Sequence, residues 1–321
     1  RGLLNKAIEL DDNLIAAKVL LGITYSQMGD YDEAMEIYTP ALKQAEELGD
    51  KYGMGGSLSN IGNVHYYKGD YEKALDYYGR SLAIKEEIGD KYGMGDSLNN
   101  IGVVHANKGD YSKALDYYGR SLAIREELGD KAGMGATLGN IGIVYQDRGE
   151  YDTALEYQNR ALKIREELGD KAGMGYNLIN IGIVYLNKGD YDKALDYYDK
   201  SLTIQEELGD KRGMGISLHN IGIVHQIRGE YNKAAEHLEK SLVIQKEIGF
   251  KAIELETTTS LYLCYRHLGK NYDEQDIHSL IKDAENIEFE VNLQLYKLLD
   301  DKSYLETAYN QVREKASAME E

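Results

Sequence analysis

Apolar residues recur along the chain at the three- and four-residue spacing of α-helices, in pairs of stretches that a short polar break separates. In one example, Leu58 and Ile61 belong to a first apolar stripe and Tyr78 and Leu82 to a second. The break between them is "KGDY", in which Gly69 suits a helix C-terminus and the following aspartate suits a helix N-terminus. The pattern predicts a helix, a tight turn and a second helix.

This helix pair repeats every 40 residues. The string "DKYGMG" begins at Asp50 and Asp90, "DKAGMG" at Asp130 and Asp170, and "DKRGMG" at Asp210. One such glycine-rich string could indicate a phosphate-binding loop, but that loop follows a buried strand, and "ALKQAEELG" before Asp50 is typical of the end of a charged helix. Five copies in register instead predict a solenoid of stacked units.

The repeat divides the chain into consecutive segments. We expect residues 1–12 to be the second helix of an upstream unit, residues 250–284 to be a degenerate seventh unit, and residues 285–321 to be closing helices. Six regular units lie between, at residues 13–49, 50–89, 90–129, 130–169, 170–209 and 210–249. Because the first residues resemble half a unit and no initiator methionine is present, we expect a part of a longer protein.

Small residues occupy two fixed positions in all six units. The glycines are Gly22, Gly62, Gly102, Gly142, Gly182 and Gly222, and the alanines are Ala34, Ala74, Ala114, Ala154, Ala194 and Ala234. Together with "GDY", this pattern resembles the tetratricopeptide repeat, and the unit length is similar to that of kinesin light chains, Pins-type polarity adaptors and bacterial signalling proteins. The resemblance implies an all-α, right-handed superhelical solenoid of antiparallel helix pairs, with C-terminal capping helices.

Differences between the units concentrate on one face of the first helix. Residues 50–89 and 90–129 differ at eight of 40 positions, and five of the eight, at 56, 59, 63, 66 and 67, share a helical face. In the family that this chain resembles, that face lines a concave groove. The variation predicts a surface that binds varied ligands, and drift at exposed positions is the alternative.

One position on this face is asparagine in all five central units. The residues at this position are Asn60, Asn100, Asn140, Asn180 and Asn220. A carboxamide can donate to and accept from the backbone of an extended peptide whatever its sequence, and the resemblance implies this role. The alternative is that each asparagine bonds a neighbouring unit and fixes the stacking.

The candidate peptide-binding residues are these asparagines and their neighbours on the same face. The neighbours are Asn63, Tyr66, Asn99, Val103, Ile143, Gln146, Ile179, Ile183, His219 and Ile223. None is a lysine or arginine, which disfavours binding of a C-terminal carboxylate. The later units are more apolar here, so we expect an extended or amphipathic apolar segment of a partner there.

Composition excludes several classes of function. The net charge of −18 and the absence of a basic stripe disfavour nucleic acid as a partner, and no apolar run is long enough to cross a membrane. Cys264 is the only cysteine, and its apolar neighbours predict a buried side chain.

His65, His105 and His225 share one unit position with Tyr145 and Tyr185, which favours packing over metal binding. We find no catalytic set, metal site or cofactor motif, and we expect a cytoplasmic protein.

These observations favour a non-catalytic protein-interaction scaffold that binds a protein or peptide ligand. A second hypothesis is the regulatory or sensor arm of a larger bacterial signalling enzyme, whose catalytic domain lies outside this chain. A third is end-to-end self-association through an apolar N-terminal face.

Overall fold

The structure is a computed structural model that describes residues 2–4, 6, 14–284 and 287–320, and all of their side chains except those of 252, 283 and 314–320. Helices account for most of these residues, and no strand occurs among them, which confirms the all-α prediction. The helices are α2 (Ile15–Gln27), α3 (Tyr31–Leu48), α4 (Lys51–Tyr67), α5 (Tyr71–Ile88), α6 (Lys91–Asn107), α7 (Tyr111–Leu128), α8 (Lys131–Asp147), α9 (Tyr151–Leu168), α10 (Lys171–Asn187), α11 (Tyr191–Leu208), α12 (Lys211–Ile227), α13 (Tyr231–Ile248), the short 3₁₀ helix η1 (Lys251–Ile253), α14 (Glu254–Leu268), α15 (Glu274–Asp283), α16 (Phe289–Leu299) and α17 (Lys302–Glu320).

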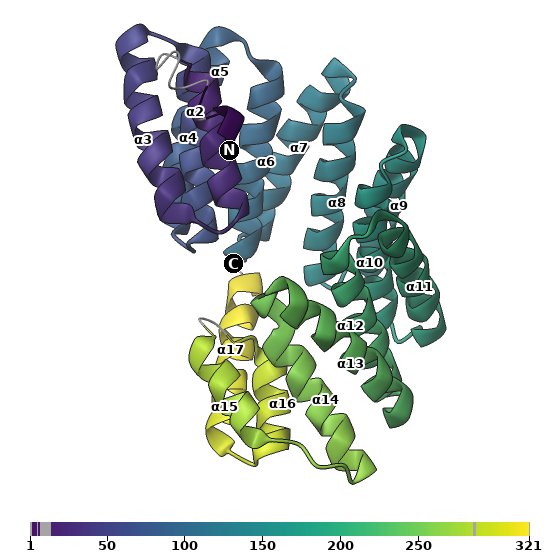
Figure 1. Cartoon of the computed structure of the whole chain (residues 1–321). Coiled ribbons are helices and arrows are strands. Elements are labelled where there is room, and N and C mark those ends of the chain that lie inside the picture. Colours follow the sequence, from purple (N-terminus) through teal and green to yellow (C-terminus); the bar gives the residue numbers. More distant parts are fainter. Residues whose placement is uncertain (1, 5, 7–13, 285–286, 321) are drawn as a thin grey trace. The chain divides into compact units, whose positions relative to one another are not determined.

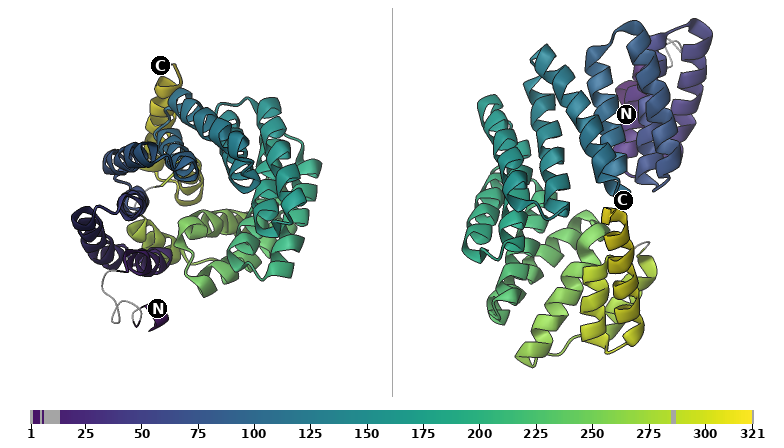
Figure 2. Two further views of the ribbon diagram at one scale, coloured as in Figure 1. Left: turned by 90° about the horizontal axis from the view of Figure 1, so that it is seen from above. Right: turned by 180° about the vertical axis from the view of Figure 1, so that it is seen from behind.

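The chain forms two compact parts, residues 1–144 and 145–321, each of which contains several of the 40-residue units. In the first, α2 packs with α3, α4 with α5 and α6 with α7 as antiparallel pairs (Figure 1). In the second, α10 and α11, and then α12 and α13, form the same kind of pair, and α14 to α17 follow them (Figure 2). The expected upstream helix at residues 1–12 lies largely outside the described residues.

The glycine at the end of each second helix allows the chain to reverse. Gly89 has a φ angle of 72°, in the left-handed region that glycine adopts without steric cost. The N–H of Asp90 then donates to the carbonyl oxygen of Lys85 over 2.9 Å, which satisfies a carbonyl at the helix end. The next first helix begins directly afterwards.

The "DKxGMG" string is a helix cap and a packing site. The Oδ1 atom of Asp90 accepts a hydrogen bond from the N–H of Gly93 over 3.0 Å, so the carboxylate already occupies an amide that a phosphate would need. A Cβ atom on Gly93 would lie 2.7 Å from Cδ of Lys85, a side chain of the preceding pair. The carbonyl oxygen of the next glycine, Gly95, accepts a bond from Ser121 over 2.8 Å. The string therefore joins three helices and forms no phosphate loop.

Within a pair, a glycine of the first helix faces a large side chain of the second. A Cβ atom on Gly102 would lie 2.6 Å from the ring of Tyr118, closer than packed atoms allow. The same relation holds for Gly22 with Tyr38, Gly62 with Tyr78, Gly182 with Tyr198 and Gly222 with Leu238. These positions explain why the sequence keeps a small residue there.

Between consecutive pairs, a buried polar contact recurs at one position of the second helix. The residues at this position are Lys85, Arg125, Gln205 and Gln245 in their respective units. Lys85 Nζ donates to Ser97 over 3.0 Å, and Gln245 donates to Thr257 over 2.9 Å. We call these four the seam residues, because they join one pair to the first helix of the next.

Beyond α13, the apolar faces of α14, α15 and α16 share one buried cluster with α13. Cys264 lies inside this cluster with no exposed surface, as predicted, and burial raises the pKa of its thiol to about 11. Such a thiol is largely protonated and unreactive at neutral pH. No helix in the described part of the chain is both long and apolar enough to span a membrane.

Candidate peptide-binding surface

All five invariant asparagines lie on first helices, one each on α4, α6, α8, α10 and α12, and all are half-buried. On each of these helices, we call the face that carries the asparagine and its variable neighbours the candidate surface. The hydrogen bonds of the five carboxamides differ, although the residue and its position are the same. These bonds decide which asparagines are available to a ligand.

Asn60 is bonded within its own helix pair. Its Nδ2 atom donates to the carbonyl oxygen of Gly56 over 2.9 Å, and its Oδ1 atom lies 3.5 Å from Nδ2 of Asn63. Asn63 in turn accepts a bond of 2.6 Å from the hydroxyl of Tyr78. These bonds use one of the two N–H groups and one of the two lone pairs of the Asn60 carboxamide, so Asn60 keeps less hydrogen-bonding capacity for a ligand than an unbonded asparagine.

Asn140 bonds the neighbouring unit. Its Nδ2 atom donates to Oδ1 of Asn99 over 3.1 Å, and Thr137 donates to the same oxygen over 3.3 Å. This geometry is the stacking role that the sequence left open as the alternative. Asn99 is likewise engaged between two pairs.

The side chains of Asn100, Asn180 and Asn220 have no hydrogen-bond partner among the residues that the structure describes. Each carboxamide can donate two bonds and accept two, and half-buried polar groups gain stability from a partner. All the donors and acceptors of these three carboxamides are therefore available for further hydrogen bonds.

The sequence analysis placed Ile179 and His219 on the candidate surface, but the structure buries both side chains. Ile179 is 4% exposed and His219 is 5% exposed, so a ligand could not reach either without moving the next pair. Nδ1 of His219 lies 2.9 Å from Thr257 Oγ1, and Nε2 lies 3.4 Å from Glu256. The position that they share directly precedes the invariant asparagine, and consecutive side chains on an α-helix point about 100° apart, so the side chain of His219 faces the following first helix.

The candidates one turn further along the helix stay half-buried on the candidate surface. They are Asn63, Val103, Ile143, Ile183 and Ile223, followed by Tyr66 and Gln146. The hydroxyl of Tyr66 accepts a bond of 2.7 Å from Asn107, and burial raises its pKa. The Oε1 atom of Gln146 is buried without a partner among the described residues. Val103, Ile143, Ile183 and Ile223 give the later units an aliphatic surface.

Exposed apolar residues extend this surface beyond the predicted residues. Ile227, at the end of α12, is 52% exposed, and Tyr67, at the end of α4, is 61% exposed and stacks on Tyr31 with ring centroids 5.8 Å apart. Their shared unit position was among the five that vary between the copies, so the variation was the signal that could have added them.

The recurring histidines are packed polar groups. His105 stacks on Tyr117 with centroids 5.5 Å apart, and its Nδ1 lies 3.0 Å from the carboxylate of Asp110. Burial lowers the pKa of His65 and of His225, which favours their neutral form at pH 7. Among the described residues, no group of three or more His, Cys, Asp or Glu side chains could hold a metal ion.

A family model described as tetratricopeptide repeat matches residues 13–87, 93–167 and 174–247. A search of curated proteins found no match. Solved structures similar to the chain include BtubC (BKLC) from P. vanneervenii, at 25% identity and a TM-score of 0.55, with 65% of this chain and 87% of that chain covered.

Two further structures share the fold at lower identity. A signal transduction ATPase with a tetratricopeptide repeat sensor, from Pyrococcus horikoshii, has 19% identity and a TM-score of 0.68, over 96% of this chain and 45% of that chain. A Rap protein complexed with competence and sporulation factor has 14% identity and a TM-score of 0.65, over 95% of this chain and 99% of that chain.

Proposed function

The chain belongs to the tetratricopeptide repeat family, whose members typically act as scaffolds for protein interaction, and we propose that it binds an extended segment of a partner protein along the first helices α10 and α12. The observation that carries this proposal is the pair of carboxamides on Asn180 and Asn220, both within residues 145–321, that have no partner among the described residues. Asn100 offers the same unbonded group on α6, within residues 1–144. The surface is built from amide, aliphatic and aromatic side chains, and we propose a non-catalytic role.

The chemistry of the candidate surface indicates what the segment contains. Ile183, Ile223 and Ile227 are aliphatic, and the candidate residues that remain on the surface carry no formal charge. A charged ligand side chain would lose hydration there without gaining a counter-charge, which is unfavourable. We therefore propose uncharged, largely aliphatic side chains where the segment crosses α10 and α12.

The carboxamides would hold the backbone of the segment and the aliphatic residues its side chains. Each hydrogen bond contributes only about 0.5–1.5 kcal/mol net, so the affinity must be spread over several contacts. This arrangement would tolerate different sequences while it keeps a preference for apolar residues. Cytoplasmic location and the exclusion of nucleic acid stay predictions.

Selection from a displayed library of random peptides tests this proposal. We expect the whole chain to enrich peptides that contain two or more aliphatic residues in an extended spacing. A photo-crosslinker in an enriched peptide should then label α10 and α12. The proposal fails if no peptide is enriched over a control without protein, or if the label is found only on the second helices.

A second candidate function is a regulatory arm of a larger signalling enzyme. The Pyrococcus structure motivates it, since there a tetratricopeptide repeat sensor is one part of an ATPase and this chain covers 45% of the whole. Sequencing the coding region on both sides of residues 1–321 decides this point. A catalytic domain in the same reading frame would support the regulatory arm, and stop codons close to both ends would exclude it.

A further inference from the structure

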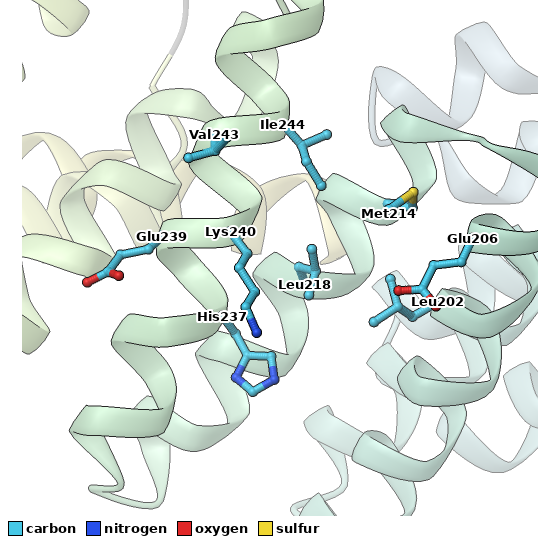
Figure 3. A pocket seen from close by; sticks show the side chains of 9 residues that line it. All are labelled: Leu202, Glu206, Met214, Leu218, His237, Glu239, Lys240, Val243 and Ile244. Carbon is cyan, nitrogen blue, oxygen red and sulfur yellow. The ribbon is translucent and has the colours of Figure 1, made fainter.

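An open cavity of about 680 Å³ lies among α11, α12 and α13, apart from the candidate surface (Figure 3). Volumes of this size are typical of sites for small ligands. Its lining combines aliphatic side chains, among them Met214, Leu218 and Ile244, with the charged side chains of Glu206, Glu239 and Lys240.

The floor of the cavity is aliphatic. Leu218 is almost fully buried, Met214 and Ile244 are half-buried, and Val243 is 67% exposed at the edge. Figure 3 shows Leu218, Met214 and Ile244 between Glu206 on one side and Lys240 on the other. A ligand would gain most from an aliphatic chain laid across these side chains, because it would remove apolar surface from water.

The rim of the cavity is negative. Lys240 is already paired with Glu236, with Nζ 2.7 Å from Oε1, and Glu239 accepts a bond of 2.8 Å from the hydroxyl of Tyr265. The carboxylate of Glu206 has no hydrogen bond or ion pair with any described residue, although the adjacent Glu207 is paired with Lys171 over 2.8 Å. One free carboxylate therefore stands beside an apolar floor.

The remaining polar side chain on the rim, His237, does not change the negative charge of the rim. Nδ1 of His237 lies 2.9 Å from the carbonyl oxygen of Lys233, to which it donates its proton, and the ring stacks on His225 with centroids 5.4 Å apart. The rim offers acceptors and negative charge, so a cation fits it better than an anion.

We propose that this cavity binds an aliphatic chain that ends in a protonated amine, with the chain on Leu218, Met214 and Ile244 and the ammonium at Glu206. Such a group has two sources, a free alkyl amine and a lysine side chain of a partner protein. The site does not depend on the proposed peptide-binding function, because none of its residues belongs to the candidate surface.

The repeat supplies a matched control in the preceding unit. Its floor positions hold Leu162, Met174, Leu178 and Ile204, and Glu166 corresponds to Glu206. The rim differs, because Tyr197 replaces His237, and the Nζ atom of Lys200 lies over the Tyr197 ring, 5.1 Å from its centroid. Thr203 replaces Val243. Because the cavity described above lies among α11, α12 and α13, Glu166→Gln serves as the control for Glu206→Gln.

Titration of hexylammonium chloride, hexanol and sodium hexanoate into the methyl-labelled whole chain tests the proposal by NMR. We expect hexylammonium to shift the methyl signals of Met214 and Ile244 and to bind about two- to fivefold more tightly than hexanol, the range that one exposed ion pair supports. Hexanoate should bind more weakly than hexanol. Glu206→Gln should abolish the preference for the ammonium, and Glu166→Gln should leave it unchanged.

The source of the amine is decided by a second probe, Nα-acetyl-lysine N-methylamide. Equal affinity for this probe and hexylammonium would assign the site to a lysine of a partner, and binding of hexylammonium alone would assign it to a free amine. The proposal is overturned if hexanol binds as tightly as hexylammonium, if Glu206→Gln keeps the preference, or if the shifted methyl groups belong to Met174 and Ile204 instead.

Discussion

At the residue scale, a few small side chains determine how closely the helices of a pair approach. Gly102 lies against the ring of Tyr118, whereas a methyl group added to Gly119 on the second helix would meet no atom within 4 Å. Both are helical glycines, and replacement by alanine raises the helix propensity of either by up to about 1 kcal/mol. Only the first has a packing reason to stay glycine.

We predict opposite effects for the two alanine variants. Gly102→Ala should lower the free energy of unfolding by about 1–2 kcal/mol, because overpacking against Tyr118 outweighs the gain in propensity. Gly119→Ala should raise it by about 0.5–1 kcal/mol. Urea denaturation followed by circular dichroism measures both, and equal stabilities for the two variants would contradict this account of the pair.

The asparagines show what the sequence could not supply at this scale. Asn60 and Asn100 stand in nearly identical strings, "SLSNIGN" and "SLNNIGV", yet only Asn60 bonds its own helix, and the second string has no counterpart of Asn63. Helical spacing could place residues on a face but not separate that face from the adjoining one. Ile179 and His219 are buried because consecutive helix pairs pack against each other. The residue spacing within one helix does not predict that packing.

At the element scale, the seam residues join consecutive helix pairs through buried polar contacts of unequal kind. Arg125 bonds the carboxylates of Asp96 and Asp130 over 2.6 and 2.7 Å. Lys85, at the same unit position, bonds only the hydroxyls of Ser59 and Ser97, and burial lowers its pKa. A buried charge without a carboxylate partner costs stability, and a paired one becomes costly when its partner is lost.

We predict that Lys85→Gln stabilises the chain. Glutamine is the residue of two later seams, Gln205 and Gln245, and it should raise the free energy of unfolding by about 1 kcal/mol at pH 7. The pKa of Lys85 is lower in the folded chain than in the unfolded chain, so the unfolded chain holds the proton more tightly. As the pH rises through the folded pKa, Lys85 loses its charge in the folded chain, and the free-energy cost of burying that charge disappears. The advantage of the variant should therefore shrink as the pH rises toward the ordinary pKa of lysine, about 10.4, as thermal unfolding at several pH values up to that pH would show. An advantage that stays constant over this range would refute the assignment.

The matched substitution at the next seam should act in the other direction. Arg125→Gln leaves Asp130 without its cation and should lower the free energy of unfolding by about 2 kcal/mol. Urea denaturation at pH 7 measures the loss. If Lys85→Gln and Arg125→Gln had the same sign, pairing would not be what distinguishes the two seams.

The paired helices and their ends could be predicted well from the sequence, because the signals are local. The aspartate caps, the left-handed glycines and the apolar stripes each act within a few residues, and Leu58 and Ile61 are buried as expected. The start of α14 was less evident, because Phe250 replaces the capping aspartate and a 3₁₀ turn precedes the helix. The seams join residues of different units and follow no local rule.

At the scale of the whole molecule, the last four helices cover apolar surface that the regular units leave. Ala234 and Leu238 of α13 have no exposed surface, and they share their cluster with Leu255, Leu261 and Leu295. In a solenoid each unit buries its face only against its neighbours, so an end needs a cover. The expected end-to-end association at the other terminus stays a prediction, since it falls largely outside the described residues.

We predict that a chain ended after Gly249 loses this cover. It should bind the dye 8-anilinonaphthalene-1-sulfonate more strongly than the whole chain and associate at rising concentration, because the apolar face of α13 meets water. Fluorescence titration and sedimentation velocity measure the two effects. A shortened chain that stays monomeric and leaves the dye unbound would show that α14 to α17 are not a cover.

The central claim is that the candidate surface binds a peptide through those carboxamides that the chain itself leaves unbonded. Its most direct test is the affinity of one library-selected peptide, by fluorescence anisotropy, for the wild-type chain, for the double variant Asn180→Ala with Asn220→Ala, and for Asn60→Ala as the matched control. Circular dichroism should first show that all three fold equally. Two bonds of about 0.5–1.5 kcal/mol each predict a loss of at least about fivefold for the double variant and little change for Asn60→Ala. Unchanged binding by the double variant, or an equal loss from Asn60→Ala, would contradict the account.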